Sequence, residues 1–243
     1  MQNQFDPRPT TGGVNAASVS VPRATRDVGL RSYMLSVYNY MASGILLTGI
    51  VAMLFANSGM AAQVMATPLR WLIVLAPLAF VMIMSFGMNR LSTGALQALF
   101  WSFAVAMGLS MSTIFLVYTG MSIAQTFFAV SAGFAGLSLW GYTTKKDLSG
   151  FGTFLIMGVV GLLVAMVINI FLQSPAMQMA ISAIGVLLFA GLTAYDTQKI
   201  KSMYAHIAGS DMLGKAAIMS ALTLYLDFIN MFQFLLSFMG DRR

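Results

Sequence analysis

The sequence contains no cysteine and no glutamate, and it has a single histidine, His206. Without cysteine, neither a disulfide framework nor a thiolate metal site can form. Charged residues of any kind are scarce, since they make up 8% of the 243 residues, whereas soluble domains carry about 25%. Hydrophobic residues make up 58% of the chain. This composition excludes an ordinary soluble domain and predicts an all-α polytopic membrane protein.

The basic residues stand between long apolar segments. The formal net charge of +6 would by itself suit a protein that binds nucleic acid. However, Arg70 and Arg90 are the only charged residues between positions 32 and 144, and positions 149–194 carry no charge. Lysines and arginines in such places set the orientation of membrane spans. The expected partner is therefore the lipid bilayer, and no nucleic acid is expected.

Seven apolar segments each approach the ~20 residues that a spanning helix needs. They are predicted at residues 35–56, 71–88, 95–117, 123–142, 151–172, 177–203 and 216–238. We therefore predict one transmembrane domain of seven helices over residues 32–243. Small residues often let membrane helices approach closely, and the spacing of four glycines predicts such contacts for Gly133, Gly136, Gly158 and Gly161.

Residues 1–31 are polar, contain several prolines and arginines, and predict a disordered cytosolic tail. With the N-terminus in the cytosol, the tail and the cytosolic loops hold ten of the 13 basic residues, as the positive-inside rule requires. Arg242 and Arg243 at the C-terminus oppose this assignment. Six spans followed by a re-entrant last segment would bring that pair inside and remain an alternative to seven spans.

Two aspartates stand inside the last two apolar segments. Asp196 belongs to the run Thr-Ala-Tyr-Asp-Thr-Gln-Lys (193–199), and Asp227 belongs to Leu-Tyr-Leu-Asp-Phe-Ile-Asn (224–230). An ionisable residue at membrane depth is costly and marks a candidate functional site. If the sixth helix ends at His206 and the seventh begins at Lys215, the aspartates lie about 15 and 18 Å from the connecting turn. An antiparallel hairpin then places both carboxyl groups on one level.

Two carboxyl groups in contact in a poorly solvated site cannot both ionise at low cost. We therefore expect Asp196 and Asp227 to titrate as a unit. With one shared proton, the pair would clasp helices six and seven together. Without that proton, the pair would be repulsive and would offer hard oxygen ligands to a cation such as calcium. The residues expected to support the pair are Tyr195, Tyr225 and Asn230.

Each aspartate also has local partners that would leave no shared proton. Asp196 could pair with Lys199 or Lys201, and Asp227 could hydrogen-bond the side chains of Tyr225 or Asn230. Arg90, at the end of the second span, is a third candidate for the site. It could form a latch to one aspartate, or it could be a boundary arginine that obeys the positive-inside rule.

Three segments together resemble the signatures of the Bax inhibitor-motif family of membrane proteins, and most closely its bacterial inner-membrane (YbhL-like) branch. They are the two aspartate runs and Lys-Lys-Asp-Leu-Ser (145–149). The order and spacing of the spans fit this family from about Arg31 to the C-terminus. The resemblance implies seven helices, with the last one central and wrapped by the other six.

The same resemblance implies a pH-sensitive calcium leak governed by aspartates that correspond to Asp196 and Asp227. It also implies an arginine at the end of the second helix that can latch onto the seventh-helix aspartate. That match falls on Asn89 or Arg90. Some relatives carry an acid within the second span, where this chain has only apolar residues and Pro77.

The leading functional hypothesis is a passive, proton-gated leak of the bacterial inner membrane, with calcium as the permeant ion and no permanently bound cofactor. The alternative is a regulatory interaction protein, for example a modulator of a membrane protease or of a stress response, which the basic tail would suit. An enzyme or a retinal photoreceptor is not expected. A retinal protein needs a lysine in the middle of its last span, but Lys215 lies at the edge of that span. A membrane hydrolase needs a nucleophile with a base, but the only histidine, His206, is expected to be a solvated turn residue.

Overall fold

A computed structural model describes residues 23–243, with side chains from Asp27 onward, and these residues form eight helices and no β-strand. The helices are α1 (Arg23–Asn57), α2 (Met60–Met65), α3 (Leu69–Gly87), α4 (Thr93–Val117), α5 (Gly120–Thr143), α6 (Ser149–Leu172), α7 (Pro175–Ile207) and α8 (Met212–Met239). Seven of them are long and apolar enough to cross a membrane. The protein is therefore an all-α polytopic membrane protein, as the sequence predicts.

The seven predicted spans correspond to α1 and α3–α8, and their limits differ from the helix ends mainly where a helix extends beyond the apolar run. The helix α8 is continuous from Met212 to Met239, so the last segment is a full span and not a re-entrant one. The short helix α2 was not predicted, because six residues are too few to show a periodic pattern.

The first helix begins at Arg23, inside the segment that the sequence assigns to the tail. Residues 23–31 thus extend the first span into a helix of 35 residues. The rest of the predicted tail, residues 1–22, lies outside the described residues and holds only one of the four tail arginines, Arg8.

Local sequence determines where several helices start and turn. Ser92, Thr119 and Ser174 each accept a hydrogen bond from a backbone N–H in the first turn of α4, α5 and α7, as N-cap residues do. Between α7 and α8 the chain turns at Gly209, whose φ of 79° lies in the left-handed region that glycine adopts without strain. Of these features, Ser174 and Gly209 mark the two ends of α7, the helix that carries Asp196.

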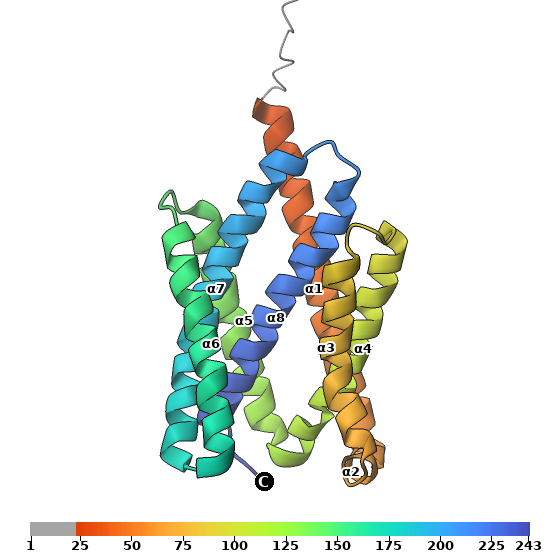
Figure 1. Ribbon diagram of the computed structural model, residues 1–243, viewed down its shortest axis with the longest axis vertical. Coiled ribbons are helices and arrows are strands. Elements are labelled where there is room, and N and C mark those ends of the chain that lie inside the picture. The colour runs from red at the N-terminus through yellow and green to blue at the C-terminus, as the bar shows by residue number, and fades with distance from the viewer. Residues whose placement is uncertain (1–22) are drawn as a thin grey trace, which may run out of the picture.

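The helices run antiparallel between two ends of the bundle (Figure 1). At the end where α1 begins, here called the N-terminal end, lie the α3–α4, α5–α6 and α7–α8 connections. The chain terminates at the opposite, C-terminal end. Those three connections and the adjacent helix turns carry the basic residues Arg90, Lys145, Lys146, Lys199, Lys201 and Lys215.

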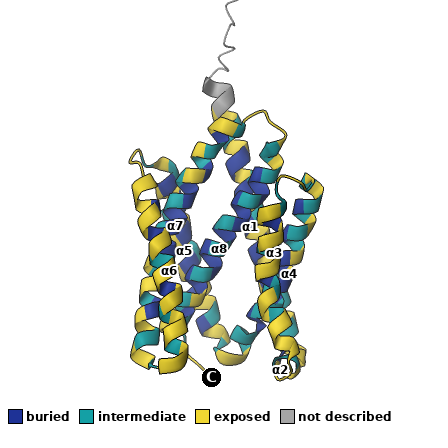
Figure 2. Ribbon diagram, viewed as in Figure 1, coloured by how far each residue is buried: buried dark blue, intermediate teal, exposed yellow. Residues whose placement is uncertain are grey.

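The last helix is the most buried one (Figure 2). In its most apolar stretch 61% of the residues are buried, against 11% in α3 and 17% in α6. It packs against α7, α1, α5 and α4, while α3 packs mainly on α4 and α6 mainly on α7. The family resemblance implies that all six other spans wrap α8, but in the structure only these four pack against it. The helices α3 and α6 form the outer layer.

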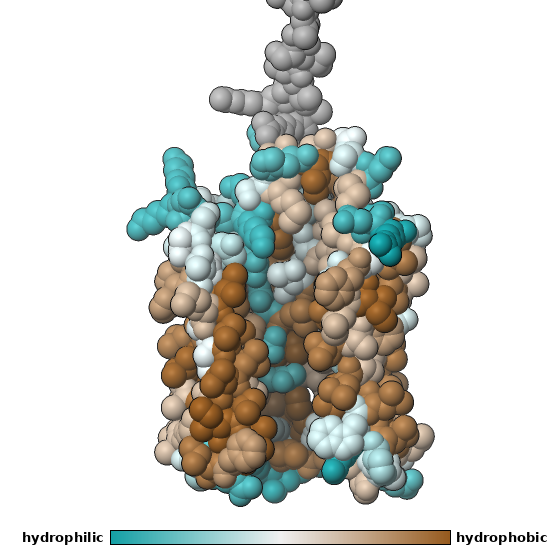
Figure 3. Space-filling model, viewed as in Figure 1, coloured by the Kyte–Doolittle hydropathy of each residue, from teal (hydrophilic) through white to brown (hydrophobic). Residues whose placement is uncertain are grey.

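The outer helices turn large apolar side chains outward, and the flanks of the bundle are hydrophobic between two polar ends (Figure 3). The prediction of close packing at Gly133, Gly136 and Gly161 was wrong, because these glycines lie on faces of α5 and α6 that no other helix covers. No atom outside their own helix lies within 4 Å of the place where a Cβ would stand at these glycines. Only Gly158 of that group meets a neighbouring helix, at Leu188.

Candidate functional site

Asp196 and Asp227 both lie in the interior of the bundle, on the two helices of the α7–α8 hairpin. Their side chains are 8% and 4% exposed, respectively. In α8, the residues around Asp227 are buried on nearly every face, from Ala216 to Phe232. The two acids therefore stand apart from the other acids of the described residues, which are exposed at the ends of the bundle.

The structure brings the two carboxyl groups together. Asp196 and Asp227 lie on packed helices, close enough for their carboxyl groups to interact through space. Oδ2 of Asp227 is fully buried, and no donor group of the described residues reaches it. A buried carboxyl oxygen without a donor is costly. A proton shared by the two carboxyl groups would meet that need.

The segment of α7 around Asp196 is held by a close approach of α5. A Cβ at Gly141 would clash with the backbone of Ala194, so only glycine lets the two helices lie this near each other. One turn away along α5, the hydroxyl group of Ser138 lies 3.3 Å from that of Thr197. These contacts fix the helix on both sides of Asp196.

Neither lysine of α7 forms an ion pair with Asp196. Lys199 is close enough for a through-space interaction with the carboxylate, but its side chain lies over the ring of Tyr195 at 5.9 Å. Lys201 donates a hydrogen bond of 2.6 Å to the backbone carbonyl of Tyr142. Lys201 thus reaches the last turn of α5, whereas Lys199 folds back along α7 onto Tyr195. The alternative of local pairing is not observed for Asp196.

The three residues predicted to support the pair contact other groups. The ring of Tyr195 packs on Gly152 of α6, and the amide of Asn230 donates to the backbone carbonyl of Leu226. The hydroxyl group of Tyr225 lies 2.6 Å from that of Thr48 on α1. None of these interactions involves Asp227, so its local alternative partners are also occupied elsewhere.

Arg90 lies far from the aspartate pair. It follows α3 in the turn before α4, its side chain is exposed, and no ion pair joins it to either acid among the described residues. The next helix begins at Thr93, which lies against Gly214. From Gly214 to Asp227 the helix α8 is about 20 Å long. The predicted latch is therefore not formed in this conformation.

Comparison with known proteins agrees with this architecture. Residues 30–243 match the family described as inhibitor of apoptosis-promoting Bax1. The chain belongs to the Bax inhibitor family. It is 48% identical over 221 residues to a protein of Rickettsia prowazekii, an alignment that covers 90% of this chain and 93% of that protein. It is also 46% identical over 230 residues to the inner membrane protein YbhL of Escherichia coli, covering 93% of this chain and 97% of YbhL. Together with the seven apolar helices, this similarity supports a multi-pass protein of the inner membrane.

The geometry explains why two segments that carry the family resemblance occur together. Gln198, in the run that contains Asp196, accepts a hydrogen bond of 2.9 Å from the backbone N–H of Leu148. The same amide donates a bond of 2.8 Å to the carbonyl of Lys146. Gln198 thus fixes the connection between α5 and α6 against α7. Sequence reasoning missed this role, although a glutamine inside a resembling motif was a usable signal.

One acid outside the spans has a perturbed titration. Two hydrogen bonds from Ser149, one from its hydroxyl group and one from its backbone N–H, lower the pKa of Asp147 below its ordinary value. The backbone bond is 2.9 Å long and closes a turn at the start of α6. His206 lies in the last turn of α7, not in the loop that was expected, and it is exposed.

Proposed function

We propose that this chain forms a passive, pH-sensitive leak for calcium and other cations across the bacterial inner membrane. In this proposal Asp196 and Asp227 share one proton and act as the gate. The observation that supports it best is that two buried carboxyl groups on neighbouring helices lie close enough to interact through space. No lysine or arginine of the described residues forms an ion pair with either group. A shared proton is therefore the simplest way to offset the cost of burying two carboxyl groups.

The presence of the proton determines the interaction between α7 and α8. With it, the carboxyl groups attract each other through a hydrogen bond and hold the two helices together. When the proton leaves, two negative charges face each other in surroundings of low polarity, where repulsion is much stronger than in water. The helices are then favoured to separate at this level. Acid therefore closes the path, and alkaline pH opens it.

Calcium fits this proposal as a passing ion. It prefers about six to eight oxygen ligands, and two carboxylates supply at most four. No group of three or more His, Cys, Asp or Glu residues is placed to hold a metal within residues 23–243. Nearby hydroxyl groups of Thr193 and Thr197 are buried in the same stretch of α7. Such an incomplete ligand set should bind calcium weakly and release it quickly, as conduction requires.

The orientation follows from the ends of the bundle. The N-terminal end carries most of the basic residues of the connections, whereas the C-terminal end carries Arg70, Arg242 and Arg243. The positive-inside rule then places the N-terminal end in the cytosol. In this orientation Asp196 lies 11 residues from the cytosolic end of α7 and Asp227 lies 15 residues from the cytosolic end of α8, both within the spans.

Calcium flux into proteoliposomes, measured with a trapped indicator at a series of pH values, tests the proposal. The wild-type protein is expected to show flux that rises with pH. Asp196→Asn and Asp227→Asn should each abolish that dependence, because an amide cannot release the proton. Asp147→Asn and Asp211→Asn, two exposed acids, are matched controls and should behave as wild type. Flux with an unchanged pH profile in both Asp196→Asn and Asp227→Asn would rule out this gate.

A further inference from the structure

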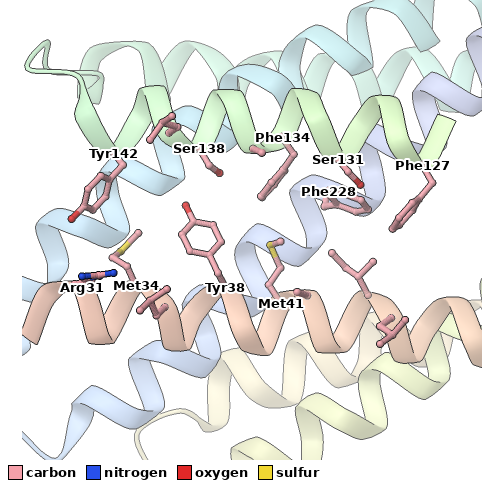
Figure 4. A pocket seen from close by; sticks show the side chains of 16 residues that line it. Arg31, Met34, Tyr38, Met41, Phe127, Ser131, Phe134, Ser138, Tyr142 and Phe228 are labelled. Carbon is pink, nitrogen blue, oxygen red and sulfur yellow. The ribbon is translucent and has the colours of Figure 1, made fainter. Parts of the chain in front are cut away.

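A long groove runs along the flank of the bundle between α1 and α5, which are not among the helix pairs that pack together in the described part of the chain. Its volume is about 820 Å³. Side chains of both helices form its walls, and Phe228 of α8 contributes to its floor (Figure 4). The wall residues used below are Arg31, Met34, Tyr38, Ala135, Ser138 and Tyr142.

Most of this groove is apolar and lies at membrane depth. From Arg31 to Leu46, both in the lining, α1 is about 22 Å long. One leaflet of a bilayer contributes about 15 Å of hydrocarbon. Leu35, Leu46 and Leu139 at the rim are 52%, 65% and 64% exposed, so the groove opens sideways toward lipid. An occupant must therefore be long, thin and apolar over most of its length.

The end of the groove nearest the N-terminal end of the bundle is different. There the guanidinium group of Arg31 and the hydroxyl group of Tyr142 face each other across the opening (Figure 4). Lys201 is not part of the lining, since its Nζ lies over the ring of Tyr142 and donates a hydrogen bond to the backbone carbonyl of that residue. No acid lines the groove. A guanidinium group and a phenol hydroxyl group suit a phosphate diester, which arginine binds through charge-assisted hydrogen bonds.

We propose that the groove between α1 and α5 holds one acyl chain of a phospholipid, with the phosphate at Arg31 and Tyr142. The lipid comes from the leaflet at the N-terminal end. Its chain runs past Met34 and Tyr38 on one side and Ala135 on the other. The apolar walls would contact the acyl chain, and the charged end of the groove would bind the phosphate. This site is independent of the leak proposed above, because lipid binding can be measured without ion flux.

Native mass spectrometry of the full-length protein in detergent tests the site. Three probes separate the contributions: phosphatidylglycerol, a diacylglycerol with the same chains, and glycerol phosphate without chains. Phosphatidylglycerol is expected to bind about tenfold or more tightly than diacylglycerol, because hydrogen bonds to a charged phosphate are strong. Glycerol phosphate should not be retained. Equal retention of phosphatidylglycerol and diacylglycerol would overturn the phosphate site, and retention of glycerol phosphate alone would overturn the role of the acyl chain.

Two pairs of variants locate the binding on the molecule. Ala135→Phe fills the groove, whereas Ala132→Phe adds the same ring to an exposed face of α5 outside it. Arg31→Gln removes the cation at the opening, whereas Arg90→Gln removes an exposed arginine at the same end of the bundle. Ala135→Phe and Arg31→Gln should each weaken phosphatidylglycerol binding about tenfold, and the two control variants should not. Wild-type binding by Ala135→Phe would overturn the proposal.

Photo-crosslinking provides a readout that does not depend on any variant. A phosphatidylglycerol with a photoreactive group in the middle of one acyl chain is incorporated into vesicles with the wild-type protein. Adducts are expected on α1 and α5, near Tyr38 and Ser138. Adducts spread evenly over the exposed faces of α3 and α6 would show ordinary contact with bulk lipid and would contradict a defined site. A dimer joined through this face without bound lipid would contradict it as well.

Discussion

The hydroxyl groups of Thr48 on α1 and Tyr225 on α8 lie 2.6 Å apart in the interior of the bundle. Thr48 donates a second bond of 2.8 Å to the backbone carbonyl of Ala104 on α4, so the hydrogen of the first bond comes from Tyr225. Three helices thus meet at one hydroxyl group. The ring of Tyr225 packs edge-on against Phe103, with 5.0 Å between the ring centres. This cluster fixes α8 two residues before Asp227.

Removing either hydroxyl group of this cluster should destabilise the protein, but not equally. Thr48→Val leaves the Tyr225 hydroxyl group buried without an acceptor, which costs about 1–3 kcal/mol. Tyr225→Phe leaves Thr48 bonded to Ala104 and should cost about 0.5–1.5 kcal/mol. Thermal unfolding of the purified variants in detergent measures both. The double variant should cost less than the sum of the two, since they share one bond. A larger loss in Tyr225→Phe than in Thr48→Val would contradict this assignment.

Among the glycines of α5, Gly141 is the one at which a larger residue would not fit. Gly141→Ala places a Cβ against the carbonyl group of Ala194, beside Asp196, and such overpacking costs about 1–3 kcal/mol. Gly136→Ala is the matched control on the same helix, because nothing lies within 4 Å of its Cβ position. Thermal unfolding should show a lower midpoint for Gly141→Ala only. Equal midpoints for the two variants would mean that α5 and α7 do not approach closely here.

Arg90 is expected to play no part in the gate in this conformation. Since its side chain is exposed in the turn before α4 and forms no ion pair with either aspartate, Arg90→Gln should leave the pH profile of calcium flux unchanged. Lys215→Gln, which removes a cation at the same end of the bundle, serves as the control for a general charge effect. A shift of the profile in Arg90→Gln alone would instead support the latch that the family resemblance implies.

The hydrogen bonds from Ser149 predict a titration change in the α5–α6 connection. Ser149→Ala removes the hydroxyl donor, so the pKa of Asp147 should rise toward its ordinary value of 3.8. Because the folded-state pKa is lowered, the stabilisation by this group is present above the unfolded-state pKa and is lost as the pH falls through the folded-state value. A carbon-13 NMR titration of the Asp147 carboxyl group checks the shift. An unchanged pKa in the variant would show that the hydroxyl bond is absent in solution.

The sequence was sufficient to predict the spans and the hairpin of the two aspartates, because both follow from apolar length and helical periodicity. Residues such as Ile200 and Tyr204 continue the buried stripe of α7 beyond Asp196, and the helix ends at Ile207 as that stripe requires. The helix α8 begins at Met212, three residues before the predicted start at Lys215, because the chain turns at Gly209 and not at Gly214. The burial of Asp196 and Asp227 follows from the same pattern.

What the sequence could not show are the contacts between helices that are far apart in the chain. The partnership of Thr48 with Tyr225 depends on the rotation of α1 against α8, which no local pattern encodes. The same holds for Gly141, whose sequence context resembles that of Gly136, and for the groove, which exists because α1 and α5 do not pack together. The position of Arg90 depends on where α3 ends relative to α8.

Infrared difference spectroscopy of the full chain in liposomes tests the shared proton most directly. A proton shared by Asp196 and Asp227 predicts a carboxylic-acid C=O band at neutral pH that disappears in Asp196→Asn and in Asp227→Asn but persists in Asp147→Asn. In the wild-type protein this band should be lost over the same pH interval in which calcium flux rises. A spectrum with no such band at neutral pH, or a band that survives both substitutions, would contradict the account.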